Sequence, residues 1–94
     1  MMSSRQRPGK HARSVMSDRR WPLLSLAARA LWLGSTDVGD VVPAVRAPGR
    51  TGVSVEDYAR YLATDTDVVR LAVRELVQCD VMEPVGSGFR LKSY

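Results

Sequence analysis

The sequence predicts a small domain of the α+β class, mainly helical, with three helices and a C-terminal two-stranded hairpin. Two observations carry this prediction. Residues 54–79 contain two amphipathic helix signals separated by a short polar break, and residues 81–92 contain two short apolar runs around a Gly-Ser-Gly turn. With 94 residues, 45% of them hydrophobic, the chain has room for one such domain and a tail.

The first helix is predicted from Leu26 to Leu33, where alanine and leucine predominate. Ser25 precedes it and can cap it, and Gly34 is expected to end it. The segment is apolar on more than one face, which is typical of a buried scaffold helix.

Residues 34–53 contain four glycines and two prolines, which predicts a connector. The connector is long for a compact domain, so it is either an insertion with a role or the location of a further element. A short strand that pairs with the hairpin is expected at Val41-Val42 or at Thr51-Gly52-Val53.

The second helix has the strongest start signal. Ser54 and Asp57 form a Ser-x-x-Asp pattern, in which the hydroxyl accepts from a free backbone N–H and the carboxylate complements the helix dipole. The apolar residues of this helix recur at i, i+3, i+4 and i+7, at Val55, Tyr58, Ala59 and Leu62.

The third helix is predicted from Thr66 to Cys79, with Asp65 or Thr66 as its cap and Asp80 in a left-handed conformation at its end. Its predicted inner face consists of Val69, Ala72, Val73 and Leu76. Its predicted outer face consists of Asp67, Arg70, Leu71, Arg74 and Gln78.

The C-terminal runs predict a hairpin of two strands, residues 81–85 and 89–92, around Gly86-Ser87-Gly88. Alternation along the second strand directs Phe89 and Leu91 inward, and Arg90 and Lys92 outward.

Positive charge is concentrated at the start of the chain. Residues 1–20 hold six basic residues and one acidic residue, a net charge of +5, whereas residues 21–94 hold eight basic and nine acidic residues, a net charge of −1. Few apolar residues lie in the first segment, so we expect a disordered, flexible N-terminal arm over 1–20 and a domain over 21–94. A basic arm suits a polyanion such as nucleic acid, and it is equally consistent with a merely solvated tail.

Other classes of function are disfavoured. The single cysteine, Cys79, rules out an intrachain disulfide, and no apolar run reaches the ~18 residues of a membrane span. Arg19-Arg20 faintly resemble a twin-arginine export signal, but Arg29 interrupts the apolar stretch that follows, so we expect a cytoplasmic protein. The chain has no Ser-His-acid set, phosphate-binding glycine loop or metal-ligand spacing, so no enzyme activity, small-molecule substrate, cofactor or metal is expected.

The segment LATDTDVVRLAVRELVQCDVMEPV (62–85) resembles the stretch from helix-turn-helix to wing in winged helix-turn-helix DNA-binding domains. WPLLSLAARALWLGS (21–35) and GFRLKSY (88–94) are similar to the first helix and the hairpin end of such domains in phage and plasmid replication-initiation proteins. The resemblance extends over about residues 21–94 and includes small prokaryotic transcriptional regulators.

The resemblance implies a protein that binds double-stranded DNA in transcriptional regulation or DNA replication, near the nucleoid, and that forms a homodimer or a larger assembly. The helix at 66–78 would enter the major groove, and the wing would contact the backbone. The implied contact residues are Thr66, Asp67, Arg70, Leu71, Arg74 and Gln78 on the helix and Ser87, Arg90 and Lys92 on the wing.

The basic arm adds Arg5, Arg7, Lys10 and Arg13 as candidate phosphate contacts. The run Arg5-Gln6-Arg7-Pro8-Gly9-Lys10 also resembles an AT-hook core, with Gln6 in the place of a glycine.

A second hypothesis is open. The predicted recognition helix begins with Asp65 and Asp67 and exposes Leu71, and the domain is close to neutral. Leu71 can contact a thymine methyl group, or it can belong, with Val68, to the interface of a protein-interaction adaptor. Arg70 and Arg74 can likewise contact DNA or belong to an ordinary solvated helix face.

Overall fold

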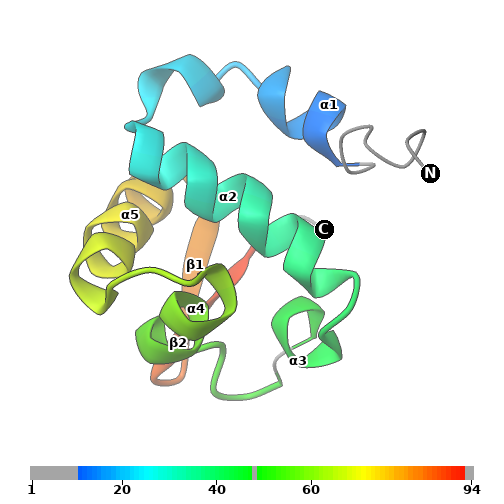
Figure 1. The fold of residues 1–94 in the computed structure, drawn as a ribbon, viewed down its shortest axis with the longest axis vertical. Helices are drawn as coiled ribbons and strands as arrows, with labels where there is room; N and C mark the ends of the chain where they lie inside the picture. Colours follow the sequence, from blue (N-terminus) through cyan, green and yellow to red (C-terminus); the bar gives the residue numbers. More distant parts are fainter. Residues whose placement is uncertain (1–10, 48, 93–94) are drawn as a thin grey trace.

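The computed structural model describes residues 11–47 and 49–92, and there the chain forms five α-helices, one 3-10 helix and one antiparallel two-stranded sheet (Figure 1). The α+β, mainly helical class and the C-terminal hairpin are therefore confirmed. The elements in chain order are α1 (Ala12–Met16), η2 (Trp21–Leu23), α2 (Leu26–Gly39), α3 (Pro43–Arg46), α4 (Val55–Leu62), α5 (Thr66–Gln78), β1 (Met82–Val85) and β2 (Gly88–Leu91).

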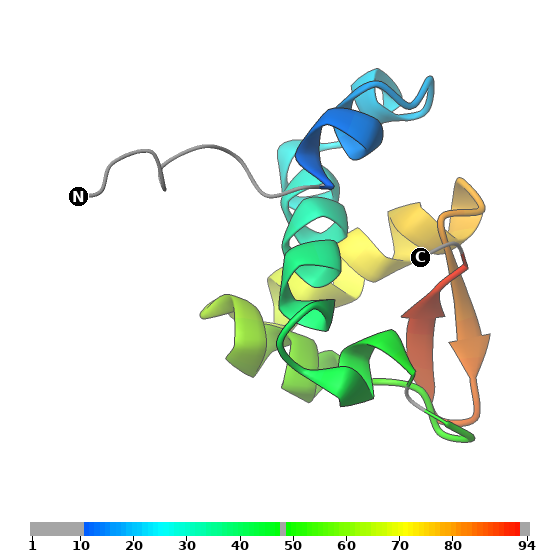
Figure 2. The same ribbon diagram turned by 90° about the vertical axis from the view of Figure 1, so that its right-hand side faces the viewer.

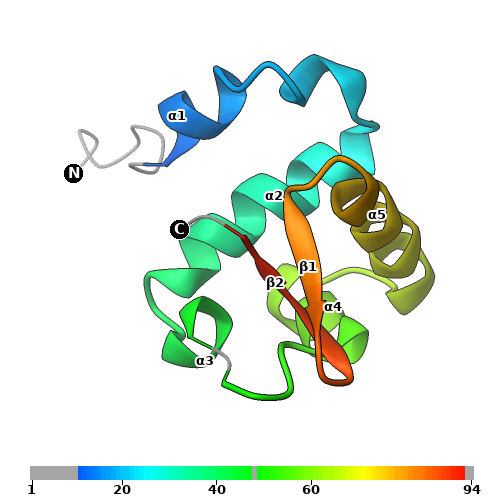
Figure 3. The same ribbon diagram turned by 180° about the vertical axis from the view of Figure 1, so that it is seen from behind.

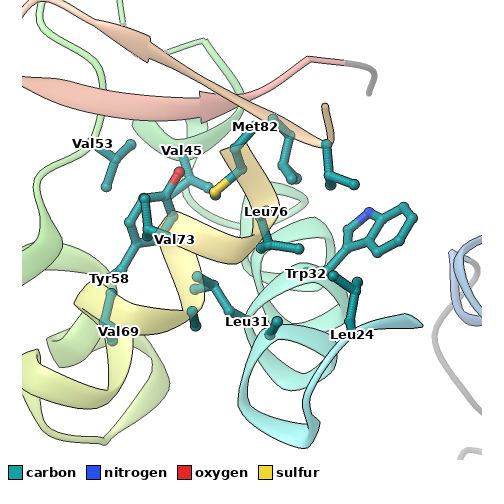
Figure 4. Packing of buried hydrophobic residues seen from close by; sticks show 14 of the residues in the cluster. Leu24, Leu31, Trp32, Val45, Val53, Tyr58, Val69, Val73, Leu76 and Met82 are labelled. Carbon is teal, nitrogen blue, oxygen red and sulfur yellow. The ribbon is translucent and has the colours of Figure 1, made fainter. Parts of the chain in front are cut away.

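The core lies where α2, α4 and α5 meet one another and the hairpin (Figure 4). The inner face of α5 is the predicted one, because Val69, Ala72, Val73 and Leu76 are all buried. Leu76 is 0% exposed and belongs to the same buried cluster as Met82 of the hairpin. The packing fixes α5 on its inner side only, so its opposite face remains at the surface.

Both predicted serine caps are present. The Ser25 hydroxyl accepts from the Ala28 N–H at the start of α2, and the Ser54 hydroxyl accepts from the Asp57 N–H at the start of α4. Asp65 occupies the N-cap position of α5, but its side chain makes no capping hydrogen bond.

Glu75 of α5 adds a cap that the sequence does not predict. Its carboxylate accepts from both the backbone N–H and the hydroxyl of Ser25, and the hydroxyl bond lowers the pKa of Glu75. In a capping box the acid comes from the third residue of the same helix. Here it comes from a different helix, so the interaction also fixes α2 against α5.

Two non-glycine residues end helices in the left-handed conformation. Ala63 (φ 55°) follows α4, and Asp80 (φ 66°) follows α5, as predicted for Asp80. In each case the next residue donates to the fifth residue back: Thr64 N–H to Ala59 O at 3.0 Å and Val81 N–H to Leu76 O at 2.8 Å. This is the Schellman pattern, which satisfies the last helical carbonyls.

The expected end of the first helix at Gly34 is wrong, because α2 continues to Gly39. A Cβ placed on Gly34 would lie 2.7 Å from Cδ2 of Leu62. The glycine therefore allows α4 to approach α2 closely rather than ending the helix.

The region expected to be a connector contains an element that was not predicted as a helix. Residues Pro43–Arg46 form α3, with proline at its first position and only Val45 buried. Of the two strand alternatives, the one at 51–53 is confirmed only at Val53, which forms an isolated bridge to Phe89 with backbone hydrogen bonds of 2.9 Å in both directions. The other is wrong, because Val42 is the N-cap of α3.

The hairpin pairs β1 with β2 in the register Met82↔Leu91, Glu83↔Arg90, Pro84↔Phe89 and Val85↔Gly88 (Figure 3). The turn therefore consists of Gly86 and Ser87, and Gly88 belongs to β2 rather than to the turn. Gly86 has φ 58°, as the first central residue of a type II′ turn requires. Leu91 is buried and Phe89 is half-buried, so both are directed inward as expected.

Folded structure begins earlier than the expected boundary at residue 20, because residues 11–20 form α1 and a turn and pack along α2 (Figure 2). Asp18 and Arg20 hold this segment against the end of α5. The Arg20 guanidinium donates to both Asp18 oxygens at 2.9 and 2.8 Å and to the carbonyls of Cys79 and Asp80 at 3.3 and 3.1 Å. It also lies 5.4 Å from the ring centre of Trp32. The expected flexible arm is thus wrong for residues 11–20, and residues 1–10 lie outside the described residues.

Replacing the left-handed alanine with glycine is expected to stabilise the fold. Ala63→Gly removes the steric cost of a Cβ at φ 55° and should raise the free energy of unfolding by about 0.5–1 kcal/mol, measured by urea denaturation. Ala30→Gly, at an exposed position inside α2, is the matched control and should lower it by about 1 kcal/mol. A destabilised Ala63→Gly variant would contradict the role given to this turn.

The Asp18–Arg20 interaction predicts a pH dependence. The hydrogen bond from the Arg20 side chain lowers the pKa of Asp18 from 3.8 to about 2. A depressed carboxyl pKa contributes stability above its unfolded value that is lost as pH falls through the folded value. Asp18→Asn should therefore cost about 1–2 kcal/mol at neutral pH, after allowance for solvent screening.

The corresponding measurement is urea denaturation of both proteins between neutral pH and about pH 2, the folded-state pKa. The difference in unfolding free energy should shrink below about pH 4 and be nearly gone at about pH 2. A difference that stays constant over this range would show that the carboxylate charge is not what holds Arg20.

Candidate nucleic-acid interface

The predicted outer face of α5 is confirmed as a surface. Asp67, Arg70, Leu71, Arg74 and Gln78 are all exposed. Thr66, the first residue of α5, is half-buried. A helix turns about 100° per residue, so Arg70 and Arg74 lie one turn apart on the edge of α5 that faces β2. Leu71 lies on the exposed face between that edge and Val68, which lines a groove beside α2.

A groove of about 270 Å³ separates α5 from β2. Three of the predicted contact residues, Arg70, Arg74 and Gln78, line it. The remaining lining residues are Val55, Val73, Val77 and Phe89. The structure thus brings the two arginines beside the hairpin, over a floor of apolar side chains.

Sequence reasoning missed Val55, Val77 and Phe89 as part of this groove. Phe89 is half-buried, so it both packs against the core and lines the groove. A signal was available for Val77, which lies three residues after Arg74 and seven after Arg70 and so shares their edge of the helix.

Most cations of this region are paired with a carboxylate. Arg70 Nη1 lies 3.0 Å from Oδ1 of Asp67, one helical turn away. On the hairpin, Arg90 Nε lies 3.5 Å from Oε2 of Glu83, which is its cross-strand partner. Arg74 is in no ion pair within residues 11–47 and 49–92. The face therefore carries mixed charge, with Arg74 as its exposed unpaired cation.

Lys92 forms the third pair, 2.6 Å from Oδ1 of Asp80. The hydrogen bond between them lowers the pKa of Asp80 and raises that of Lys92. Both groups lie in solvent, so salt screens the pair and an incoming anion competes for Lys92 at little cost.

The remaining predicted contacts are divided between the hairpin and the start of the chain. Ser87 is exposed at the tip of the turn, on the same hairpin as Arg90 and Lys92. Arg13 is exposed on α1. Arg5, Arg7 and Lys10 lie outside the described residues.

Nothing in the described part of the chain forms a group of three or more metal-ligating side chains. His11 contacts the Asp40 carboxylate at 3.1 Å, and Cys79 is half-buried at the end of α5. Within the same residues, no helix is both long and apolar enough to cross a membrane.

Comparison of the chain with protein-family models, with curated proteins and with solved structures found no match.

Proposed function

We propose that the chain is a winged helix-turn-helix protein that binds duplex DNA, with α5 as recognition helix and β1–β2 as wing. Three features of the fold support the proposal. α4 and α5 are joined by the three residues 63–65, the length typical of a helix-turn-helix. The hairpin follows α5 directly, and α5 keeps its outer face free of other elements.

The observation that carries the proposal is the position of Arg70 and Arg74 on the edge of α5 beside the hairpin. The major groove of B-DNA is about 12 Å wide and admits one α-helix. With α5 in that groove, the guanidinium groups reach guanine edges or phosphates. Arg90 and Lys92 of the wing would then lie against the neighbouring backbone.

The arginines of the N-terminal segment add further positive charge that attracts the DNA backbone. Arg13 and Arg19 are exposed, whereas Arg20 is held by Asp18 and by backbone carbonyls and makes no contact with DNA. The biological role in this proposal is transcriptional regulation or replication initiation, in a prokaryotic or phage setting.

Arg74→Ala provides the first test. Loss of one phosphate contact should make the slope of log K against log salt shallower by about 0.9. If Arg74 instead contacts a base edge, binding should weaken by a factor consistent with about 1–3 kcal/mol and sequence preference should relax. Fluorescence anisotropy with a labelled duplex measures both effects.

The control is Arg46→Ala, since Arg46 is an exposed arginine on α3, an element away from α5 (Figure 1). The Arg46→Ala variant should bind the duplex with the same affinity and the same salt slope as the unchanged protein. Failure of the unchanged protein to bind any duplex at low salt would end the proposal.

Removing the acidic partner of Arg70 should strengthen DNA binding. Asp67→Asn frees the guanidinium from its 3.0 Å ion pair and removes a negative charge from the start of the recognition helix. Duplex affinity at low salt should rise by about three- to tenfold, close to the 1 kcal/mol scale of an exposed pair. An unchanged or weaker affinity would place Arg70 outside the interface.

A second candidate function is a protein-interaction adaptor built on the same fold. The mixed charge of the α5–hairpin face favours it, as does Leu71, which is 60% exposed. The two functions predict opposite rankings of the variants by their effect on binding. For an adaptor, Leu71→Asp abolishes the complex and Arg70→Ala with Arg74→Ala leaves it intact, whereas DNA binding responds most to the arginines.

A further inference from the structure

The groove between α5 and the hairpin has an apolar floor that DNA contacts would leave uncovered. The floor consists of Val55 from the start of α4, Val73 and Val77 from α5, and Phe89 from β2. Val73 is buried, whereas the other three are half-buried and keep apolar surface open to solvent. Phosphate oxygens and guanine edges, which the arginines would contact in DNA, bring no apolar group to this floor.

The polar side chains that line the same groove are hydrogen-bond donors. They are Arg70, Arg74 and Gln78, all from α5, and no acidic residue is among the described residues that line the groove. A guanidinium group binds a carboxylate through two parallel N–H···O bonds, and the amide of Gln78 can donate a further one. The groove therefore offers an anion-binding edge beside an apolar floor.

The charge balance of this edge fits a ligand with a single negative charge. Asp67 already pairs with Arg70 at 3.0 Å, and on the hairpin Glu83 pairs with Arg90 at 3.5 Å. Arg74 is in no ion pair within residues 11–47 and 49–92. One carboxylate is enough to neutralise that remaining charge.

The dimensions of the groove limit the apolar part of the ligand. Its volume of about 270 Å³ is below the roughly 300–1,000 Å³ of pockets that hold drug-sized molecules. Arg70 and Gln78 lie eight residues apart on α5, which is about 12 Å along the helix axis. The floor also includes one aromatic ring, Phe89, against which a second ring can pack. A single ring or a short chain therefore fits.

We propose that this groove binds a small carboxylic acid with an aromatic or short aliphatic body, and that the acid competes with DNA for Arg74. The body would lie over Val77 and Phe89 and leave contact with water, which drives binding. The carboxylate would accept from Arg74, with Gln78 beside it. Binding of the acid rests on the groove alone, whereas its effect on DNA rests on the proposed function.

The competition makes the acid a regulator of the proposed DNA site. A guanidinium that holds a carboxylate is not available to a phosphate or a base. The acid should therefore lower the affinity for DNA by the same factor by which DNA lowers the affinity for the acid.

The probe is phenylpropionate, titrated into the isotope-labelled full chain and followed by heteronuclear NMR. Backbone amide signals of Val55, Val77 and Phe89 should shift saturably. Those of Ala30 and Val68, which line the groove between α2 and α5, should not.

Three related compounds separate the contributions of body and charge. Phenylpropanamide has the same body without the charge, phenylpropylamine carries the opposite charge, and propionate has the carboxylate without the ring. Each lacks one of the two contacts, so each should bind at least about tenfold more weakly than phenylpropionate.

Arg74→Met keeps the apolar stem of the side chain and removes its charge. It should weaken phenylpropionate binding about tenfold and leave phenylpropanamide binding unchanged. Arg74→Glu should reverse the preference, so that phenylpropylamine binds more tightly than phenylpropionate. The matched control is Arg46→Met, because Arg46 is exposed on α3 and does not line the groove. It should leave all affinities unchanged, and circular dichroism verifies that each variant is folded.

Three results would overturn the site: equal binding of phenylpropionate and phenylpropanamide, saturable shifts confined to residues outside the groove, or equal affinities of Arg74→Met and Arg46→Met. A concentration-dependent dimer whose contact includes Val77 and Phe89, with no binding of phenylpropionate, would assign the floor to a second copy instead.

Fluorescence anisotropy with a labelled duplex tests the competition. Phenylpropionate should release the duplex, and phenylpropanamide at the same concentration should not. Duplex binding that persists when the groove is saturated with phenylpropionate would overturn the competition. A chain that binds phenylpropionate but no duplex would contradict the proposed function and support the acid site, so the two failures give different results.

Discussion

The close packing of α2 against α5 is the contact on which the other parts of the structure depend. α2 and α5 are in contact, and each buries a small side chain, Ala28 on α2 and Ala72 on α5. Glu75 adds a hydrogen-bonded link at one end, because it caps α2 from α5. Once α5 is fixed in this way, its last turn determines where β1 begins, and the hairpin can close over Leu76.

The same packing gives α5 two edges of different chemistry. One edge carries Arg70 and Arg74 and faces the hairpin. The other carries Val68 and faces α2. The buried residues of α5 lie on its inner face. A single helix thus presents a charged edge and an apolar edge on either side of the core.

Local signals in the sequence were sufficient for much of the fold. Ser25 and Ser54 cap helices through their own hydroxyl groups, and the four inner residues of α5 recur at helical spacing, so these elements depend on near neighbours. Asp80 also follows from local reasoning, because asparagine and aspartate tolerate the left-handed conformation.

The predictions that are wrong concern residues whose contacts lie far away in the sequence. Gly34 looks like a helix end until Leu62 is seen against it. α3 buries only Val45, so its four residues leave no periodic pattern. Residues 11–20 look like a solvated tail because the carbonyls that bind Arg20 belong to residues 79 and 80. The ion pairs of the candidate interface depend on cross-strand register and on side-chain reach, which the sequence does not specify.

The contact of Arg20 with the end of α5 has a consequence for the order in which the protein is made. A ribosome releases Arg20 some sixty residues before the carbonyls of Cys79 and Asp80. These carbonyls reach their positions only when α5 has formed its terminal turn. Residues 11–20 are therefore among the last to dock, because a nascent chain that ends before residue 79 lacks the carbonyls that hold Arg20.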